Sequence, residues 1–300
     1  MGPLHAIGLV LHPERDAKRA IDAVVEWARS RDVTVLGLPE EVDRLVCDAV
    51  AVPPHELVER ADLLISLGGD GTMLRSMRLV AGHATPVLGV NLGRLGFLAE
   101  IDVTGLPTAL SDIEAGHYSV EPRMALRSVV PDGPCLPDPK PVLAFNDIAL
   151  VRIPGQAMAA IAILVQGQEF VRYAADAVLA STPTGSTAYS FSAGGPIVSP
   201  TVDAVLVVAA SAHSTFDRAL VLAADEYPSL QVLPVSGRLA VEVDGRVEAY
   251  VGPGVRLDVT PVRAAALVVR FGRTTFYERA RRKLRVTGSL EVEEPGGARR

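Results

Sequence analysis

Continuous apolar runs alternate with a helix-like pattern through the first third of the sequence. Strand-like runs occupy residues 6–11, 33–38, 63–67 and 87–90. Between the first two, residues 14–29 carry apolar side chains at helical spacing. Uninterrupted apolar strands separated by helices indicate a parallel sheet that is buried on both faces. Because ligands bind beyond the carboxyl ends of such strands, a site is expected in the loops that follow them.

A glycine-rich loop follows each of the last two strands. Residues 67–72 read LGGDGT and residues 91–97 read NLGRLGF. Glycine lets the backbone approach a ligand closely, and a helix that begins at Thr72 would present N–H groups and a positive dipole end to phosphate. The carboxylate of Asp70 would repel phosphate but could accept the proton of an attacking hydroxyl. The loop therefore indicates phosphoryl transfer to an alcohol; the alternative is a tight turn in which Asp70 only caps a helix.

From about residue 119 the pattern changes to short β-branched runs between turn signals. This spacing is typical of an antiparallel all-β domain, either a sandwich or a layered sheet. The expected strands are residues 125–130, 142–151, 160–165, 177–180, 205–210, 238–243, 255–259 and 265–271. The fold class predicted for the whole chain is α/β plus all-β, with a Rossmann-like N-terminal domain that carries the GGDGT loop and a β-rich, sandwich-like C-terminal domain.

A second informative segment begins at Asp176 and runs through an apolar strand into STPTGSTAYS, residues 181–190. Its hydroxyl and N–H groups suit the ribose, base and phosphates of a nucleotide, and the Ala188-Tyr189 pair could lie against a flat base. A loop of this composition, taken alone, is more often a plain turn between strands. Whether these residues bind a nucleotide or form a plain turn therefore depends on the other segments that lie beside them.

Composition and motif content exclude several other classes. The longest apolar stretch, residues 204–210, is far too short to span a bilayer, and the net charge of −6 argues against nonspecific nucleic-acid binding. The two cysteines, Cys47 and Cys135, predict reduced thiols and no disulfide framework. Zinc-helix, P-loop and hydrolase-elbow motifs are absent from the sequence, so no protein-held metal is expected. Without a signal peptide, the expected location is cytoplasmic.

Three longer segments resemble those of the NAD kinase family, in particular its bacterial type. They read LGGDGTML from Leu67, VLGVNLGRLGFLAE from Val87 and STPTGSTAYSFSAGGPIV from Ser181. The resemblance implies an active site between an N-terminal α/β domain and a C-terminal β-rich domain, with the end of the chain packed back on the first. We therefore expect domains of residues 1–104, joined by residues 277–300, and 105–276.

The resemblance also implies a reaction. NAD kinases transfer the γ-phosphoryl group of ATP, or in some members a phosphoryl group of polyphosphate, to the 2′-hydroxyl of the adenosine ribose of NAD, which gives NADP. A divalent cation, Mg²⁺ or Mn²⁺, bridges the donor phosphates. The expected partners are thus NAD and ATP, with neither nucleic acid nor membrane, and the expected assembly is a homodimer or homotetramer.

Matching the motifs residue by residue assigns the catalytic half of the site. The resemblance makes Asp70 the acceptor of the hydroxyl proton and places Gly71 beside the substrate. Arg75 is expected near the pyrophosphate or the donor phosphates. The expected phosphate-donor loop consists of Gly68, Gly69, Gly71 and Thr72.

The same matching assigns the dinucleotide half. Asn146 and Asp147 are expected to hold the adenosine portion of NAD, and Asp176 is expected to contact the ribose or amide on the nicotinamide side. The expected lining of the adenine and ribose pocket is Thr187, Ala188, Tyr189, Ser190, Phe191 and Ser192.

Two other functions stay open at the level of sequence. A lipid or sugar kinase could share a GGD-type loop, although no apolar groove for an acyl chain can be identified. A non-catalytic dinucleotide-binding protein could have kept the pocket. Its support is Asp147, where the family usually has glutamate, together with Ala175, where the family often has glycine.

Overall fold

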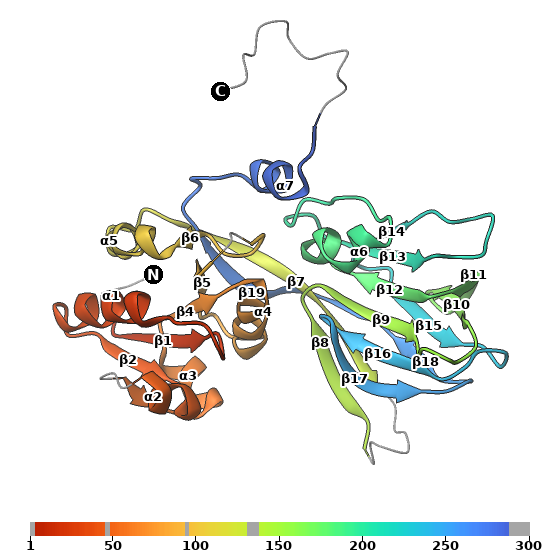
Figure 1. Cartoon of the computed structure of the whole chain (residues 1–300), viewed down its shortest axis with the longest axis horizontal. Helices are drawn as coiled ribbons and strands as arrows, with labels where there is room; N and C mark the ends of the chain where they lie inside the picture. The colour runs from red at the N-terminus through yellow and green to blue at the C-terminus, as the bar shows by residue number, and fades with distance from the viewer. Residues whose placement is uncertain (1–3, 46–48, 94–95, 131–137, 288–300) are drawn as a thin grey trace, which may run out of the picture.

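The computed structural model describes residues 4–45, 49–93, 96–130 and 138–287. Cys47, Cys135 and the last residues of the chain lie outside these ranges. Two lobes are visible, and two long strands, β7 (Ser119–Val130) and β19 (Thr260–Arg270), run between them (Figure 1). Within the described ranges, none of the helices has the length and apolarity needed to cross a membrane.

A parallel sheet with helices on both faces forms the N-terminal lobe. Its elements are β1 (Ala6–Leu11), α1 (Lys18–Arg29), β2 (Thr34–Gly37), α2 (Pro39–Leu45), β3 (Val50–Ala51), α3 (Pro54–Arg60), β4 (Leu63–Gly68), α4 (Asp70–Leu79), β5 (Val87–Asn91) and α5 (Leu106–Glu114). The strand order is β3-β2-β1-β4-β5. Ile7 and Leu9 of β1 pack with α1 and α5, whereas Ala6 and Val10 pack with α3 and α4, because successive side chains of a strand point to opposite faces. This arrangement confirms the predicted Rossmann-like lobe.

The sheet of this lobe continues beyond β5. β19 pairs with β5, β7 pairs antiparallel with β19, and β8 (Lys140–Ala144) pairs with β7. The short β6 (Ile101–Asp102) pairs with β5 off this path, ahead of a single 3-10 turn, η1 (Val103–Gly105). The β-rich part of the chain therefore contributes strands to the N-terminal sheet, across the expected boundary after residue 104.

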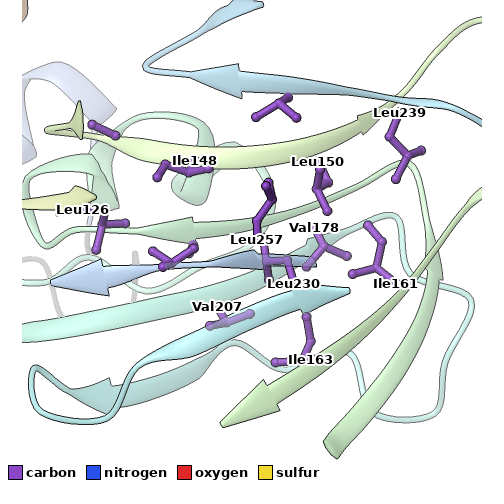
Figure 2. Close-up of a cluster of buried hydrophobic side chains, with 14 of the residues drawn as sticks. Leu126, Ile148, Leu150, Ile161, Ile163, Val178, Val207, Leu230, Leu239 and Leu257 are labelled. Carbon is purple, nitrogen blue, oxygen red and sulfur yellow. The ribbon is translucent and has the colours of Figure 1, made fainter. Parts of the chain in front are cut away.

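Two antiparallel sheets make up the second lobe. Their strands are β9 (Asp147–Arg152), β10 (Ala159–Val165), β11 (Gln168–Ala175), β12 (Ala177–Ser181), β13 (Ala204–Ala210), β14 (Leu220–Ala223), β15 (Pro228–Val232), β16 (Leu239–Val243), β17 (Arg246–Val251) and β18 (Arg256–Asp258). The sheet orders are β11-β10-β15-β18 and β14-β13-β12-β9-β16-β17. Figure 2 shows Ile161 and Leu230 of the first sheet and Ile148 and Val178 of the second meeting in one apolar core. The predicted sandwich-like domain is confirmed.

The strand prediction was wrong in several places. Residues 142–151 form two strands, β8 and β9, because the chain turns at Phe145-Asn146. The edge strands β11 and β17 were not predicted, since most of their side chains are exposed or half-exposed and they lack the apolar run that marks their buried neighbours. The short strands β14 and β15 were not predicted either, and β15 is mostly buried inside its sheet.

Candidate active site

Asp70 is the first residue of α4, and only Gly69 separates it from the end of β4. The N-cap of the helix is Gly69, and no side chain caps it. The Asp70 carboxylate instead accepts the backbone N–H groups of Phe97 at 2.9 Å and Leu98 at 3.0 Å, in the loop after β5. The helix thus begins two residues before Thr72, and the role of Asp70 as a mere helix cap is wrong.

Glycines allow the two glycine-rich loops to meet. A Cβ on Gly96 would lie 1.9 Å from Asp70 Oδ1, and a Cβ on Gly68 would lie 2.1 Å from Thr72 Oγ1. The parallel register of β4 with β5 pairs Gly68 with Asn91. Both loops therefore leave the sheet at the same carboxyl edge, as the sequence predicted.

On the β-rich lobe, the turn at Asn146 is tied to the hydroxyl-rich segment of residues 181–190. The Asn146 carbonyl oxygen accepts the N–H of Thr182 at 2.8 Å and the hydroxyl of Ser181 at 3.1 Å. A Cβ on Gly185 would lie only 2.2 Å from the same oxygen. Two segments that are far apart in sequence thereby form one rigid unit.

The variant Gly185→Ala is expected to lower the free energy of unfolding by about 1 to 3 kcal/mol, because the added methyl group overlaps backbone atoms that cannot move alone. Urea denaturation measures this loss. Gly252→Ala is the matched control, since no neighbouring atom lies within 4 Å of its Cβ position. Equal unfolding midpoints for the two variants would show that the contact at Asn146 is not tight.

Asp244, in the turn after β16, connects this unit to α4. Its carboxylate accepts three successive backbone N–H groups of residues 145–147 at 2.7 to 3.3 Å. The same carboxylate forms an ion pair with Arg78, in the last turn of α4. One helix therefore carries Asp70 at its start and contacts the support of the Asn146 turn near its end.

Asp147 is 2% exposed and stands among other carboxylates. Burial, together with the charges of Asp244 and Glu242, raises the pKa of Asp147 to about 7. Burial and the charges of Glu242, Asp147 and Asp176 likewise raise the pKa of the Tyr189 hydroxyl. Three of the predicted dinucleotide-binding residues thus lie close enough to influence one another electrostatically.

Asp147 is expected to make the stability of the free protein depend on pH. A carboxyl whose pKa rises on folding stabilises the fold while protonated, and this stabilisation is lost as the pH rises through its folded pKa of about 7. Between pH 5 and 8 the free energy of unfolding should fall by about 2 kcal/mol, and Asp147→Asn should flatten this decline. Urea denaturation at each pH measures it.

The control for this prediction is Asp102→Asn, because the pKa of Asp102 is lowered by hydrogen bonds from Thr104 and Gly105. The Asp102 carboxyl is ionised between pH 5 and 8 in both the folded and the unfolded protein. Asp102→Asn should therefore keep the wild-type decline of the free energy of unfolding with pH. A wild-type protein without any slope would contradict the prediction.

Two predicted site residues have ion-pair partners within the chain. Asp176 is about half exposed and pairs with Arg152 at 3.2 Å. Arg75 pairs with the buried carboxylate of Glu41 and donates to the Leu11 carbonyl oxygen at 3.2 Å. The guanidinium of Arg75 is thus held at the carboxyl end of β1, and its expected contact with phosphates stays a prediction.

A cavity of about 320 Å³ lies where the two lobes meet. From the N-terminal lobe it is lined by Phe97 and Leu98, whose N–H groups hold the aspartate at the start of α4. From the β-rich lobe it is lined by Thr184 and Thr187 of the hydroxyl-rich segment, and its far wall is the C-terminal helix α7 (Phe276–Leu284). The loop that holds the Asp70 carboxylate and the hydroxyl-rich segment therefore line one cavity, whereas Asp70 itself lies behind Phe97 and Leu98 and is not part of the lining.

Buried charges join α7 to the loop that holds Asp70. The Glu100 carboxylate, 2% exposed, pairs with Arg270 at 2.9 Å and with Arg279 at 2.8 Å. Arg270 also donates to the Leu98 carbonyl oxygen at 3.0 Å. This cluster was missed in the sequence, because its members are far apart along the chain and no local motif marks them.

Two family models match the chain. Residues 28–118 match the ATP-NAD kinase N-terminal domain, and residues 145–271 match the ATP-NAD kinase C-terminal domain. The NAD kinase of Moorella thermoacetica is 36% identical over 97% of this chain and 93% of its own length. NAD kinase 1 of Streptomyces coelicolor is 35% identical over 95% of this chain and 86% of its own length. The chain belongs to the NAD kinase family.

Solved structures in the NAD kinase family have the same fold. Yeast NADH kinase complexed with NADH matches with a TM-score of 0.85 and 26% identity, over 98% of this chain and 91% of that one. An NAD kinase from Archaeoglobus fulgidus in complex with ATP matches with a TM-score of 0.69 and 24% identity, over 94% and 100%. Membership favours dinucleotide phosphorylation over the lipid- and sugar-kinase alternatives.

The pocket residues expected from the NAD kinase motifs differ in exposure. The segment turns through η2 (Thr184–Thr187) into the short helix α6 (Tyr189–Ser192). Thr187, Ala188 and Tyr189 are half-buried, Ser190 is buried, and Phe191 and Ser192 are exposed. The first three therefore suit direct contact with a nucleotide better than the last two, which face solvent in the free protein.

Proposed function

We propose that Asp70 is the general base of this NAD kinase, which transfers the γ-phosphoryl group of ATP to the 2′-hydroxyl of the adenosine ribose of NAD. The observation that carries the proposal is the shared cavity. The loop that orients the Asp70 carboxylate and the hydroxyl-rich segment both line it. A dinucleotide held by one lobe would thus present its ribose to the other.

In the proposed reaction the ribose 2′-oxygen attacks the γ-phosphorus. The bond from that phosphorus to the β–γ bridging oxygen breaks, ADP leaves, and the hydroxyl proton passes to Asp70. The N–H groups of Phe97 and Leu98 each occupy one acceptor position on the carboxylate. Each carboxylate oxygen has a second lone pair, so the orienting bonds leave Asp70 able to accept a proton.

The β-rich lobe is proposed to bind NAD. Asn146 and Asp147 hold the adenosine portion, and the Tyr189 ring packs against the base. A carboxyl with a pKa of about 7 can donate to one ribose oxygen when protonated and accept from a hydroxyl when ionised. The half-exposed Asp176, which immediately precedes β12, contacts the nicotinamide side.

The glycine loop before α4 is proposed to receive the donor phosphates, because the first N–H groups of a helix are free to bind anions. The described residues include no group of three or more His, Cys, Asp or Glu side chains that could hold a metal ion. The Mg²⁺ or Mn²⁺ expected from the sequence is therefore proposed to arrive bound to the donor.

We also propose that the protein works in the cytoplasm as a homodimer or homotetramer. Large apolar side chains are exposed on three sheet edges: Phe170 on β11, Val221 on β14 and Tyr250 on β17. Unpaired strand edges with apolar side chains favour assembly. Light scattering on the purified chain tests the assembly, and a monomer at every concentration would rule it out.

A coupled assay tests the reaction. The purified chain is incubated with NAD, Mg²⁺ and ATP, and NADP is detected with an NADP-specific dehydrogenase. NADP formation is the expected result. Binding of NAD without NADP formation would instead identify a non-catalytic dinucleotide sensor. Replacing ATP with polyphosphate shows whether a second phosphoryl donor is accepted, and replacing NAD with NADH shows whether the reduced dinucleotide is also phosphorylated.

A further inference from the structure

Arg15, in the connection between β1 and α1, reaches over both glycine-rich loops. Its Nη1 atom lies 3.8 Å from the position that a Cβ on Gly69 would take and 3.0 Å from that of a Cβ on Gly93. Gly69 directly precedes Asp70, and Gly93 lies in the loop after β5. The guanidinium therefore stands where the two loops meet, although no motif in the sequence marked it.

The backbone that carries Arg15 is anchored to the same strand end. The N–H of His12 donates to the Leu67 carbonyl oxygen at 2.9 Å, immediately before the GGDGT glycines. The His12 Nδ1 atom then accepts the N–H groups of Glu14 and Arg15, both at 3.1 Å. These bonds fix the backbone turn from which the Arg15 side chain extends toward the two loops.

The charge of Arg15 is also available. The two arginines of α4 are occupied, since Arg75 pairs with Glu41 and Arg78 pairs with Asp244. Arg15 is exposed, and among the described residues no carboxylate pairs with its guanidinium. An unpaired cation beside Asp70 offsets the repulsion that this carboxylate would exert on an incoming polyphosphate.

We propose that Arg15 binds the terminal phosphates of the phosphoryl donor. This inference rests on the proposed function, and it adds a donor-specific residue to the site. A guanidinium presents a planar fork of N–H groups that matches two phosphate oxygens. ATP and inorganic polyphosphate share those terminal phosphates, so Arg15 acts on both donors, whereas NAD binds on the β-rich lobe and is unaffected.

The decisive experiment varies ATP at saturating NAD, and then NAD at saturating ATP, for wild type and Arg15→Gln. The KM for ATP should rise by about ten- to a hundredfold, the usual worth of a charge-assisted hydrogen bond, while the KM for NAD changes less than about twofold. Calorimetric binding of tripolyphosphate should weaken by a similar factor. Arg15→Lys should recover part of the loss, because it restores the charge without the fork.

Arg19→Gln is the matched control. Arg19 is exposed in the first turn of α1, four residues after Arg15. Its glutamine variant removes the same positive charge at a position outside the two glycine-rich loops. Equal effects of both glutamine variants would reduce the role of Arg15 to general electrostatics and overturn the proposal. A rise in the KM for NAD alone would also overturn it, because Arg15 would then bind the acceptor.

The experiment separates this inference from the proposed function. If wild type forms NADP and Arg15→Gln keeps its KM for ATP, only the role of Arg15 fails. If wild type forms no NADP, the proposed reaction fails, and the tripolyphosphate measurement still decides whether Arg15 binds a phosphate chain.

Discussion

Asp70→Asn is expected to lower kcat by about two to four orders of magnitude, the usual loss for a general base. The amide keeps the size of the carboxylate, and its oxygen can still accept one of the N–H bonds from residues 97 and 98. It cannot take up the hydroxyl proton. The affinity for NAD should therefore change little. The coupled assay gives kcat, and calorimetry gives the dissociation constant of NAD.

Asp102→Asn is the matched control for this change. Asp102 also accepts a backbone N–H in the N-terminal lobe, that of Gly105 at 2.9 Å, and it caps η1. Its amide variant should keep kcat within about twofold of wild type, because the lost charge lies outside the proposed site. Near-normal turnover of Asp70→Asn would show that the carboxylate only orders the loop.

Gly96→Ala should lower kcat by about two to three orders of magnitude without unfolding the protein. The new methyl carbon would lie 1.9 Å from Asp70 Oδ1, so the carboxylate must rotate away from its N–H donors. A short side chain can move at modest cost, whereas misplacement of a catalytic group by about 1 Å lowers the rate steeply. Gly252→Ala, whose Cβ position has no neighbour within 4 Å, controls for the substitution itself.

A double variant tests whether Gly96 acts through Asp70. If it does, Asp70→Asn with Gly96→Ala should be little slower than Asp70→Asn alone, because both changes remove the same contribution. If the loss of kcat in the double variant equals the product of the two single losses, Gly96 does not act through Asp70. Thermal unfolding of all three proteins separates lost catalysis from lost folding.

The buried half of the fold could be predicted from the sequence because its signals are local. β1, β4 and β5 are uninterrupted apolar runs, the last two followed by glycine-rich loops, and their parallel pairing follows from the helices between them. The strand ends at β8 and β9 could not be predicted, since the turn at Asn146 interrupts an apolar stretch without a glycine or proline. Exposed edge strands escaped prediction for a related reason: their apolar side chains do not alternate clearly.

The candidate site likewise has one part that local motifs predict and another that depends on contacts between residues far apart in the sequence. Asp70 and the segment of residues 181–190 are marked by local motifs, and the structure places that segment and the loop that holds Asp70 around one cavity. The ion pair between Arg78 and Asp244 joins residues 166 apart in the sequence, and the pair between Glu100 and Arg270 joins residues 170 apart. A lone arginine in a helix gives no indication of its partner, so contacts that fix the lobes against each other emerge only from the folded chain.

The strands shared by both lobes restrict how this enzyme can move. β7 and β19, twelve and eleven residues long, belong to one hydrogen-bonded ladder that crosses from lobe to lobe (Figure 1). Kinases that close around their substrates by a hinge require a pliable connection, and here rotation would break strand pairing. For a donor and an acceptor that bind as proposed, we therefore expect the fold to set their separation, and we expect the motions of catalysis to be small displacements of loops and side chains.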